Sequence, residues 1–153
     1  MRGELREEKV ESRYYHLRLV NEKRLNVARE AQIVITSIEE KGPDGRPRGA
    51  YTVPLPLSWQ YQHLLDPSPH RTVGAQAYIA DLLFVRDDGL FLTPIFMPNN
   101  FPGRFDKAVI FWITLQARSI ETESLPLRLQ ISWDGKWERG EAEMAKHLVI
   151  EPV

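Results

Sequence analysis

Several side chains in this sequence are of the types that bind metal ions. The chain has four histidines, His16, His63, His70 and His147, and two of them, His63 and His70, share a loop with Asp66. Imidazole nitrogens and carboxylate oxygens are common ligands of zinc and other transition metals. None of these residues, however, forms the His-x-x-x-His pair or the closely spaced cluster that identifies a metal site. We predict no metal centre and retain His63, Asp66 and His70 as the metal-ligand candidates.

Aromatic residues beside two loops could bind a ligand by stacking. Trp59 and Tyr61 border the loop that holds the two histidines, and Trp137 follows an Asp-Gly turn. An exposed aromatic ring offers a flat apolar surface for a sugar ring, although Trp59 and Trp133 also suit core packing at strand ends. We retain Trp59, Tyr61 and Trp137 as the ligand-binding candidates.

Motifs for catalysis and for DNA binding have simpler structural explanations. No serine lies in a Gly-x-Ser-x-Gly elbow, which would expose a nucleophile on a strand-to-helix turn. The acidic pair Asp87 and Asp88 precedes Gly89, and a tight hairpin explains it better than acid–base chemistry. The segment 45–49 (Gly-Arg-Pro-Arg-Gly) is similar to a minor-groove hook, but turn chemistry explains it too. We predict no catalytic residue, no enzyme activity and no cofactor.

The composition is that of one ordinary globular domain. The chain has 153 residues, a formal net charge of -1 and no cysteine. This charge supplies no field to hold a nucleic acid, and the absence of cysteine excludes disulfides and thiolate chemistry. We find no apolar run of membrane-spanning length and no signal peptide, so the default compartment is the cytoplasm. Association with a membrane would need a segment outside this chain.

The apolar pattern predicts strands rather than helices. Residues 1–12 form a charged leader that we expect to be flexible, and one domain is expected over 13–153. Segments 13–21 and 28–38 alternate apolar and polar side chains, as half-buried strands do. We expect them to pair in one antiparallel sheet. Their predicted core residues are Leu17, Leu19, Ile33 and Ile35.

The rest of the chain continues in the same way. Further strands are expected at 74–86 and 90–96, joined by a tight turn, at 108–117 and 125–133, and at 148–150. The strictest alternation gives an inward face of Leu125, Leu127, Leu129, Ile131 and Trp133. Prolines at 54, 56 and 94 mark edge segments, long loops are expected at 60–73 and 97–107, and a helix at 138–147. About seven or eight strands at this spacing predict a sandwich or barrel.

The junction of the first two strands resembles a known family. Val20-Asn21 closing one strand and residues 28–35 opening the next are similar to the Asn-turn-Ala pattern of bacterial immunoglobulin-like modules of the kind found in cell-adhesion-related domains. Such modules usually have Gly after the Asn, where this chain has Glu22 and Lys23. The resemblance implies an immunoglobulin-like β-sandwich, and together with the strand pattern and the expected helix at 138–147 it gives an all-β, antiparallel immunoglobulin-like β-sandwich with one short C-terminal helix. It also implies a spacer or interaction role and carries over no catalytic residue.

Three functions are therefore carried forward. The first is a non-enzymatic protein-interaction or accessory module that could form the soluble part of a larger assembly, with a protein as its partner. The second is a carbohydrate-binding module that uses exposed aromatic residues, and the third is a metal-dependent enzyme on a β-sandwich or barrel. Convergence of histidines would favour the third function, and exposed aromatic rings on one face would favour the second.

Overall fold

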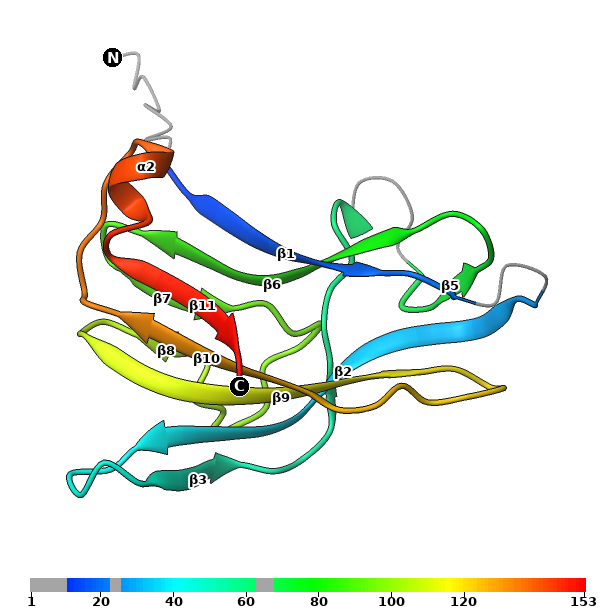
Figure 1. Cartoon of the computed structure of the whole chain (residues 1–153), viewed down its shortest axis with the longest axis horizontal. Coiled ribbons are helices and arrows are strands. Elements are labelled where there is room, and N and C mark those ends of the chain that lie inside the picture. The colour runs from blue at the N-terminus through cyan, green and yellow to red at the C-terminus, as the bar shows by residue number, and fades with distance from the viewer. Residues whose placement is uncertain (1–10, 23–25, 63–67) are drawn as a thin grey trace, which may run out of the picture.

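The computed structural model describes residues 11–22, 26–62 and 68–153, and it folds into two antiparallel β-sheets (Figure 1). The smaller sheet has the order β1 (Arg13–Leu19), β6 (Tyr78–Arg86), β7 (Gly89–Leu92) and β8 (Arg104–Phe105). The larger sheet has the order β11 (Leu148–Pro152), β10 (Leu127–Trp133), β9 (Val109–Arg118), β2 (Ala28–Lys41) and β3 (Pro47–Tyr51). The short strands β4 (Leu55–Pro56) and β5 (Arg71–Val73) also pair with β2.

The inward faces of both sheets build one apolar core. From the larger sheet, Ile35, Phe111 and Ile131 are fully buried, and from the smaller sheet Leu83 and Leu90 are fully buried as well. Because side chains alternate along a strand, each sheet is left with an outward face that no second layer covers within the described residues. The all-β, two-sheet class that we predicted is therefore confirmed.

The first two strands lie in different sheets, so the prediction that they pair was wrong. β1 pairs with β6, whereas β2 pairs with β9. The chain crosses between the sheets after Asn21, whose side-chain amide donates to the carbonyls of Asn26 (2.6 Å) and Val73 (3.0 Å). Alternation assigns a strand's faces but not its partner, which is a long-range choice. The predicted core residues Ile33 and Ile35 are buried, and Leu17 and Leu19 are partly buried against the same core.

More strands form than the seven or eight predicted. The described residues contain eleven, because four short strands, β3, β4, β5 and β8, form in segments that lack a long alternating pattern. Two of them, β5 and β8, lie inside the expected long loops at 60–73 and 97–107. In the expected helix at 138–147, only α2 (Glu141–Met144) is helical. No helix in the described part of the chain is long and apolar enough to span a bilayer.

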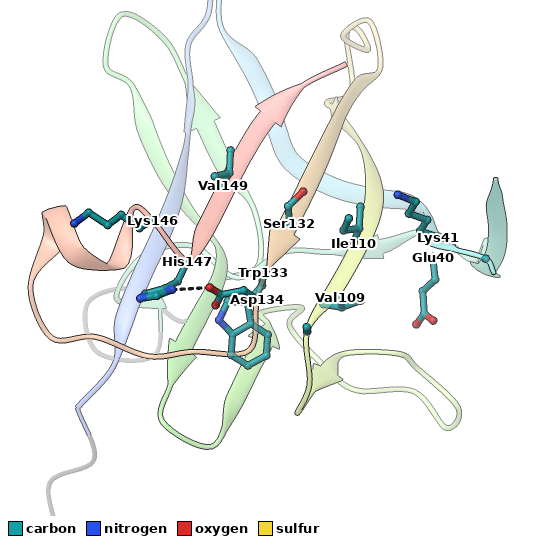
Figure 2. Close-up of a pocket in the computed structure, with 12 residues that line it drawn as sticks. Glu40, Lys41, Val109, Ile110, Ser132, Trp133, Asp134, Lys146, His147 and Val149 are labelled. Atoms are coloured by element: carbon teal, nitrogen blue, oxygen red, sulfur yellow. Dashed lines mark hydrogen bonds and ion pairs between the residues drawn. The ribbon is translucent and has the colours of Figure 1, made fainter. Parts of the chain in front are cut away.

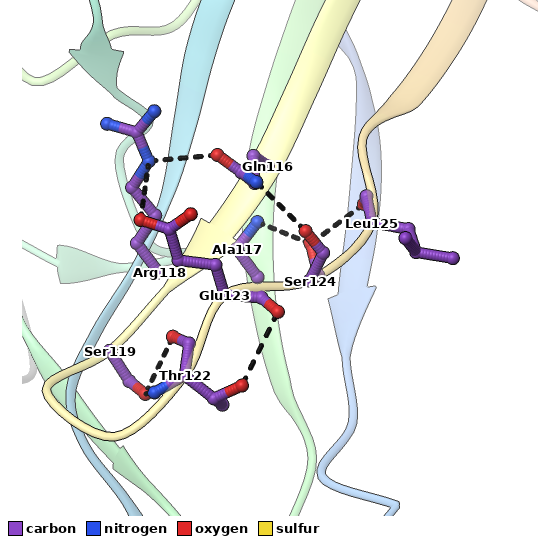
Figure 3. Close-up of polar contacts among 8 residues, drawn as sticks. All are labelled: Gln116, Ala117, Arg118, Ser119, Thr122, Glu123, Ser124 and Leu125. Carbon is purple, nitrogen blue, oxygen red and sulfur yellow. Dashed lines mark hydrogen bonds and ion pairs between the residues drawn. The ribbon is translucent and has the colours of Figure 1, made fainter.

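The hairpin between β9 and β10 extends past the core. Leu129, Ile131 and Trp133 point inward as predicted, but Leu125 is 90% exposed and Leu127 40% exposed, so their predicted inward placement was wrong. At this end, polar side chains hold the turn together (Figure 3): Ser124 Oγ accepts from the backbone N–H of Ala117 at 2.9 Å. β10 begins at Leu127, so Leu125 lies before the strand and Leu127 at its first position, and both side chains remain in contact with water.

A β-bulge in β6 sets which side chains reach the outer face of the smaller sheet. Tyr15 pairs with Leu83 and His16 with Asp81, so Leu82 is an extra residue without a partner in β1. Leu82 and Leu83 are both buried. An extra residue in one strand shifts the phase of alternation beyond it. The bulge therefore places Asp81, before it, and Phe84, after it, on the same outward face.

Candidate functional site

Three aromatic side chains cross the outer face of the smaller sheet in one line. Tyr14 of β1 pairs with Phe84 of β6, and Phe84 pairs with Phe91 of β7. The ring centroids are 5.1 Å apart for Tyr14 and Phe84, and 4.8 Å apart for the stacked rings of Phe84 and Phe91. We call these three residues the aromatic row. Cross-strand aromatic neighbours of this kind stabilise a sheet, but here they do so on the side that faces solvent.

Arginine side chains lie over one end of the aromatic row. The guanidinium carbon of Arg86 is 4.5 Å from the Phe91 ring centroid, and that of Arg104 is 5.2 Å from it. Arg86 also forms an ion pair with Asp88, with Nε 3.0 Å from Oδ1. Arginine and aromatic residues are both enriched in protein interfaces relative to the rest of the protein surface. The row therefore has the composition of a contact surface.

A pocket of about 620 Å³ opens beside the other end of the row. Its apolar lining includes Tyr14 and Phe84 of the row, together with Tyr61 and Met97 from two loops. Its polar lining includes His16, Ser58, Gln60, Asp81 and Thr93. We call it the Asp81 pocket. Pockets of this size that combine apolar walls with a few polar groups are typical ligand sites.

Asp81 is the charged group of this pocket. Its Oδ1 lies 2.9 Å from Nδ1 of His16, and because a carboxylate can only accept, His16 donates this hydrogen bond. The backbone N–H of Asp81 donates to the Ser58 carbonyl at 2.9 Å, which fixes the strand here. Burial raises the pKa of the Asp81 carboxyl above its usual value, and the contact with His16 offsets only part of that shift. The contact with His16 thus offsets only part of the cost of burying the negative charge of Asp81.

The predicted ligand-binding residues are only partly brought together. Trp59 and Tyr61 both line the Asp81 pocket, but Trp59 is 2% exposed, and its Nε1 donates to the Pro69 carbonyl at 3.1 Å. Tyr61 is 57% exposed. Trp137 is partly buried against the core and does not line this pocket. Of the three candidates, Tyr61 alone has the exposure that a stacking platform requires.

The predicted metal ligands cannot be assembled into a site from what the structure describes. His63 and Asp66 lie outside the described residues, so their part of that prediction is untested. His70 is exposed in a turn, where its backbone N–H lies 3.4 Å from Ser68 Oγ. Within the described ranges, no three side chains of the metal-binding types come together.

A second hollow lies on the outer face of the larger sheet (Figure 2). It has a volume of about 710 Å³, and Ile110, Ser132 and Val149 from three neighbouring strands line it. Charged residues of both signs surround it: Glu40, Lys41, Asp134 and Lys146. Because the two signs are mixed, the charge of this hollow favours no class of ligand.

One edge of this hollow is held by a histidine that bridges two segments. His147 Nδ1 is 2.6 Å from Asp134 Oδ2, and its Nε2 is 3.5 Å from Glu138 Oε1. The hydrogen bond to Asp134 raises the pKa of His147. Burial alone would raise the pKa of Asp134, but the hydrogen bonds from His147 and from the backbone of Lys136 lower it overall. These contacts connect the end of β10 to the start of β11, so the role of His147 here is to stabilise the fold.

The comparisons with known proteins do not identify this chain. No family model matches it, and no curated protein or solved structure was found to be similar. The resemblance to immunoglobulin-like modules therefore stays a prediction.

Sequence reasoning missed most of the residues that form this site. Tyr14 and His16 carried a usable signal, because they alternate with the inward side chains of their strand. Phe84 and Asp81 carried none, because the bulge between them makes two consecutive leucines point inward and breaks the period of two. Phe91 needed its pairing with Phe84 to be recognised as part of a row.

Proposed function

We propose that this chain is a non-enzymatic protein-interaction module that binds a protein partner on the outer face of its smaller sheet. The observation that carries the proposal is the aromatic row, which stays partly open to water: Tyr14 is 49% exposed. Phe96 and Met97, in the loop after β7, are also exposed, and Met97 shares the Asp81 pocket with the row. Contiguous apolar surface beside arginine is typical of sites where proteins associate.

We further propose that the sandwich is immunoglobulin-like, as the resemblance implies. Two antiparallel sheets packed face to face support this class. In the constant-type immunoglobulin arrangement the first two strands are neighbours in one sheet, whereas here β1 and β2 belong to different sheets. A determined structure of a relative with a clear family assignment would test the class.

The interaction proposal is tested with two matched variants on opposite faces. Phe91→Ala shortens the aromatic row, and Trp112→Ala removes an aromatic side chain from the outer face of the larger sheet, where Trp112 is also partly exposed. A partner found by affinity capture would be purified and titrated against both variants by calorimetry. We expect Phe91→Ala to weaken binding by about tenfold or more, the range of an aromatic contact residue. Equal affinity of both variants and the unmodified chain would contradict the proposal, as would hydrolytic turnover in a substrate screen.

A carbohydrate is the second candidate ligand, supported by one observation. Tyr61 is exposed beside the hydrogen-bonded pair of His16 and Asp81, so an aromatic surface and polar groups meet in the same pocket. Nuclear magnetic resonance titration with a panel of mono- and disaccharides would test it. Chemical shift changes confined to this pocket, and lost in Tyr61→Ala, would favour a sugar over a protein.

A further inference from the structure

The Asp81 pocket carries a charge that suggests what enters it, and this step rests on the proposed function. Asp81 is the only carboxylate among the described residues that line the pocket, and no Lys or Arg lines it. Its side chain is 15% exposed, so it is mostly shielded from water but still reachable. A mostly shielded carboxylate whose one charge-bearing neighbour among the described lining residues is His16 gains from a further, positively charged partner group.

The walls of the pocket favour a cation as well. Tyr14, Tyr61 and Phe84 contribute aromatic rings, whose faces carry partial negative charge. Two arginines lie at the other end of the row: Arg86 and Arg104 lie over Phe91, and the guanidinium carbon of Arg86 is also 5.5 Å from the Phe84 ring centroid. Arg18 of β1 is exposed on the same face, two residues after His16, but it is not among the residues that line the pocket.

The hydrogen bonds of Asp81 narrow the choice of cation. Oδ1 accepts from His16, whereas Oδ2 has no hydrogen-bond partner among the residues that the structure describes. Arginine binds a carboxylate best through two parallel bonds to both oxygens, but an ammonium group is a compact charge that needs one. The free oxygen suits lysine better than arginine.

We propose that the Asp81 pocket receives a lysine side chain of the protein partner, with its ammonium group on Asp81 Oδ2 and its methylene chain against Tyr61 and Tyr14. The anchoring is directional, because the lysine must enter beside the aromatic row while other residues of the partner contact the row and the guanidinium groups that lie over it. Lysine's long apolar stem allows its charge to reach a recessed acceptor in this way.

The test uses small probes on the whole chain, labelled with nitrogen-15. N-acetyl-lysine methylamide is titrated and compared with N-acetyl-norleucine methylamide, which keeps the stem without the charge, and with N-acetyl-arginine methylamide. We expect the lysine probe to shift the backbone signals of Asp81 and Tyr61, and to bind more tightly than either of the others. Equal shifts with the norleucine probe, or tighter binding of the arginine probe, would overturn the proposal.

Variants make the same test specific to the carboxylate. Asp81→Asn keeps the shape of the side chain and removes its charge, and we expect the affinity for the lysine probe to fall by about tenfold or more, as for a lost charge-assisted hydrogen bond. Asp87→Asn removes the same charge from the exposed turn after β6 and should leave the affinity unchanged. Equal affinities in both variants would refute the pocket's role.

The failure of this inference can be separated from failure of the proposed function. If a purified protein partner loses affinity with Phe91→Ala but not with Asp81→Asn, the interaction face stands and the lysine pocket is refuted. If the lysine probe binds through Asp81 while Phe91→Ala has no effect on the partner, the pocket stands and the proposed docking face is refuted.

Discussion

Two adjacent residues of β9 give the sharpest test of the sandwich, because they point to opposite sides of one sheet. Phe111 is fully buried, and its ring stacks on Phe105 of the other sheet with centroids 4.6 Å apart. Ile110 lies on the outer face and lines the open hollow there. Replacing a buried Phe by Ala costs about 3–5 kcal/mol of unfolding free energy, and loss of the stack is part of that cost. Ile110→Ala should cost about 1 kcal/mol or less, since its side chain is only partly buried.

Both free energies can be measured by urea unfolding, followed by the fluorescence of the buried Trp59 and Trp133. For a chain of this size, about 2–4 °C of melting temperature accompanies each kcal/mol, so Phe111→Ala should lower it by roughly 6–20 °C. If the slope of unfolding free energy against urea concentration is the same in both variants and the unmodified chain, the variants differ from it in stability alone. If Ile110→Ala destabilised the chain as much as Phe111→Ala, the faces of β9 would be assigned wrongly and the two-sheet core would have to be rebuilt.

Three further predictions concern a turn, a charge bridge and the aromatic row. Gly135 has φ +86°, and an added Cβ would lie 3.0 Å from the Ala108 backbone nitrogen, so Gly135→Ala should cost about 1–3 kcal/mol in thermal or urea unfolding. Because the raised pKa of His147 means that the folded state holds its proton more tightly, the bridge to Asp134 should stabilise the chain fully below about pH 6.5. That contribution should disappear as pH rises through the raised pKa of His147. The melting temperature of His147→Gln should therefore lack this dependence on pH, and the same pH dependence in both proteins would contradict the bridge. A double-mutant cycle of Arg86→Gln and Phe91→Leu should give a coupling of about 0.5–1 kcal/mol, and a value near zero would mean that the guanidinium does not hold its place over the ring.

The sequence was sufficient for the core but not for the arrangement of strands around it. Leu129, Ile131 and Trp133 are inward because alternation along one strand is a local property. The same rule failed at Leu125, because β10 begins only at Leu127, where its pairing with β9 starts, and that starting point depends on residues outside the strand. Partner choice has the same long-range origin, so β1 could be recognised as a strand while its pairing with β6 could not.

The candidate site was hidden for a related reason. Tyr61 was found because an aromatic residue beside a loop is visible in the sequence, but Asp81 belongs to a strand that was expected to alternate without interruption. A bulge leaves no reliable mark in sequence, since two adjacent leucines suit a buried strand equally well. Only the pairing of His16 with Asp81 reveals that the carboxylate faces outward into a pocket.

The extra residue in β6 also has a consequence for how this chain tolerates insertions and deletions. Leu82 has no partner in β1. The residues before and after it pair with β1 as they would in a regular strand that lacked Leu82. Removing Leu82 would therefore shorten β6 by one residue and leave Asp81 and Phe84 on the same face. Removing a residue nearer the middle of β6, such as Ala80, would exchange the inward and outward faces for the part of the strand beyond it. Position 82 is thus where lineages of this protein could gain or lose a residue while keeping the same outer surface.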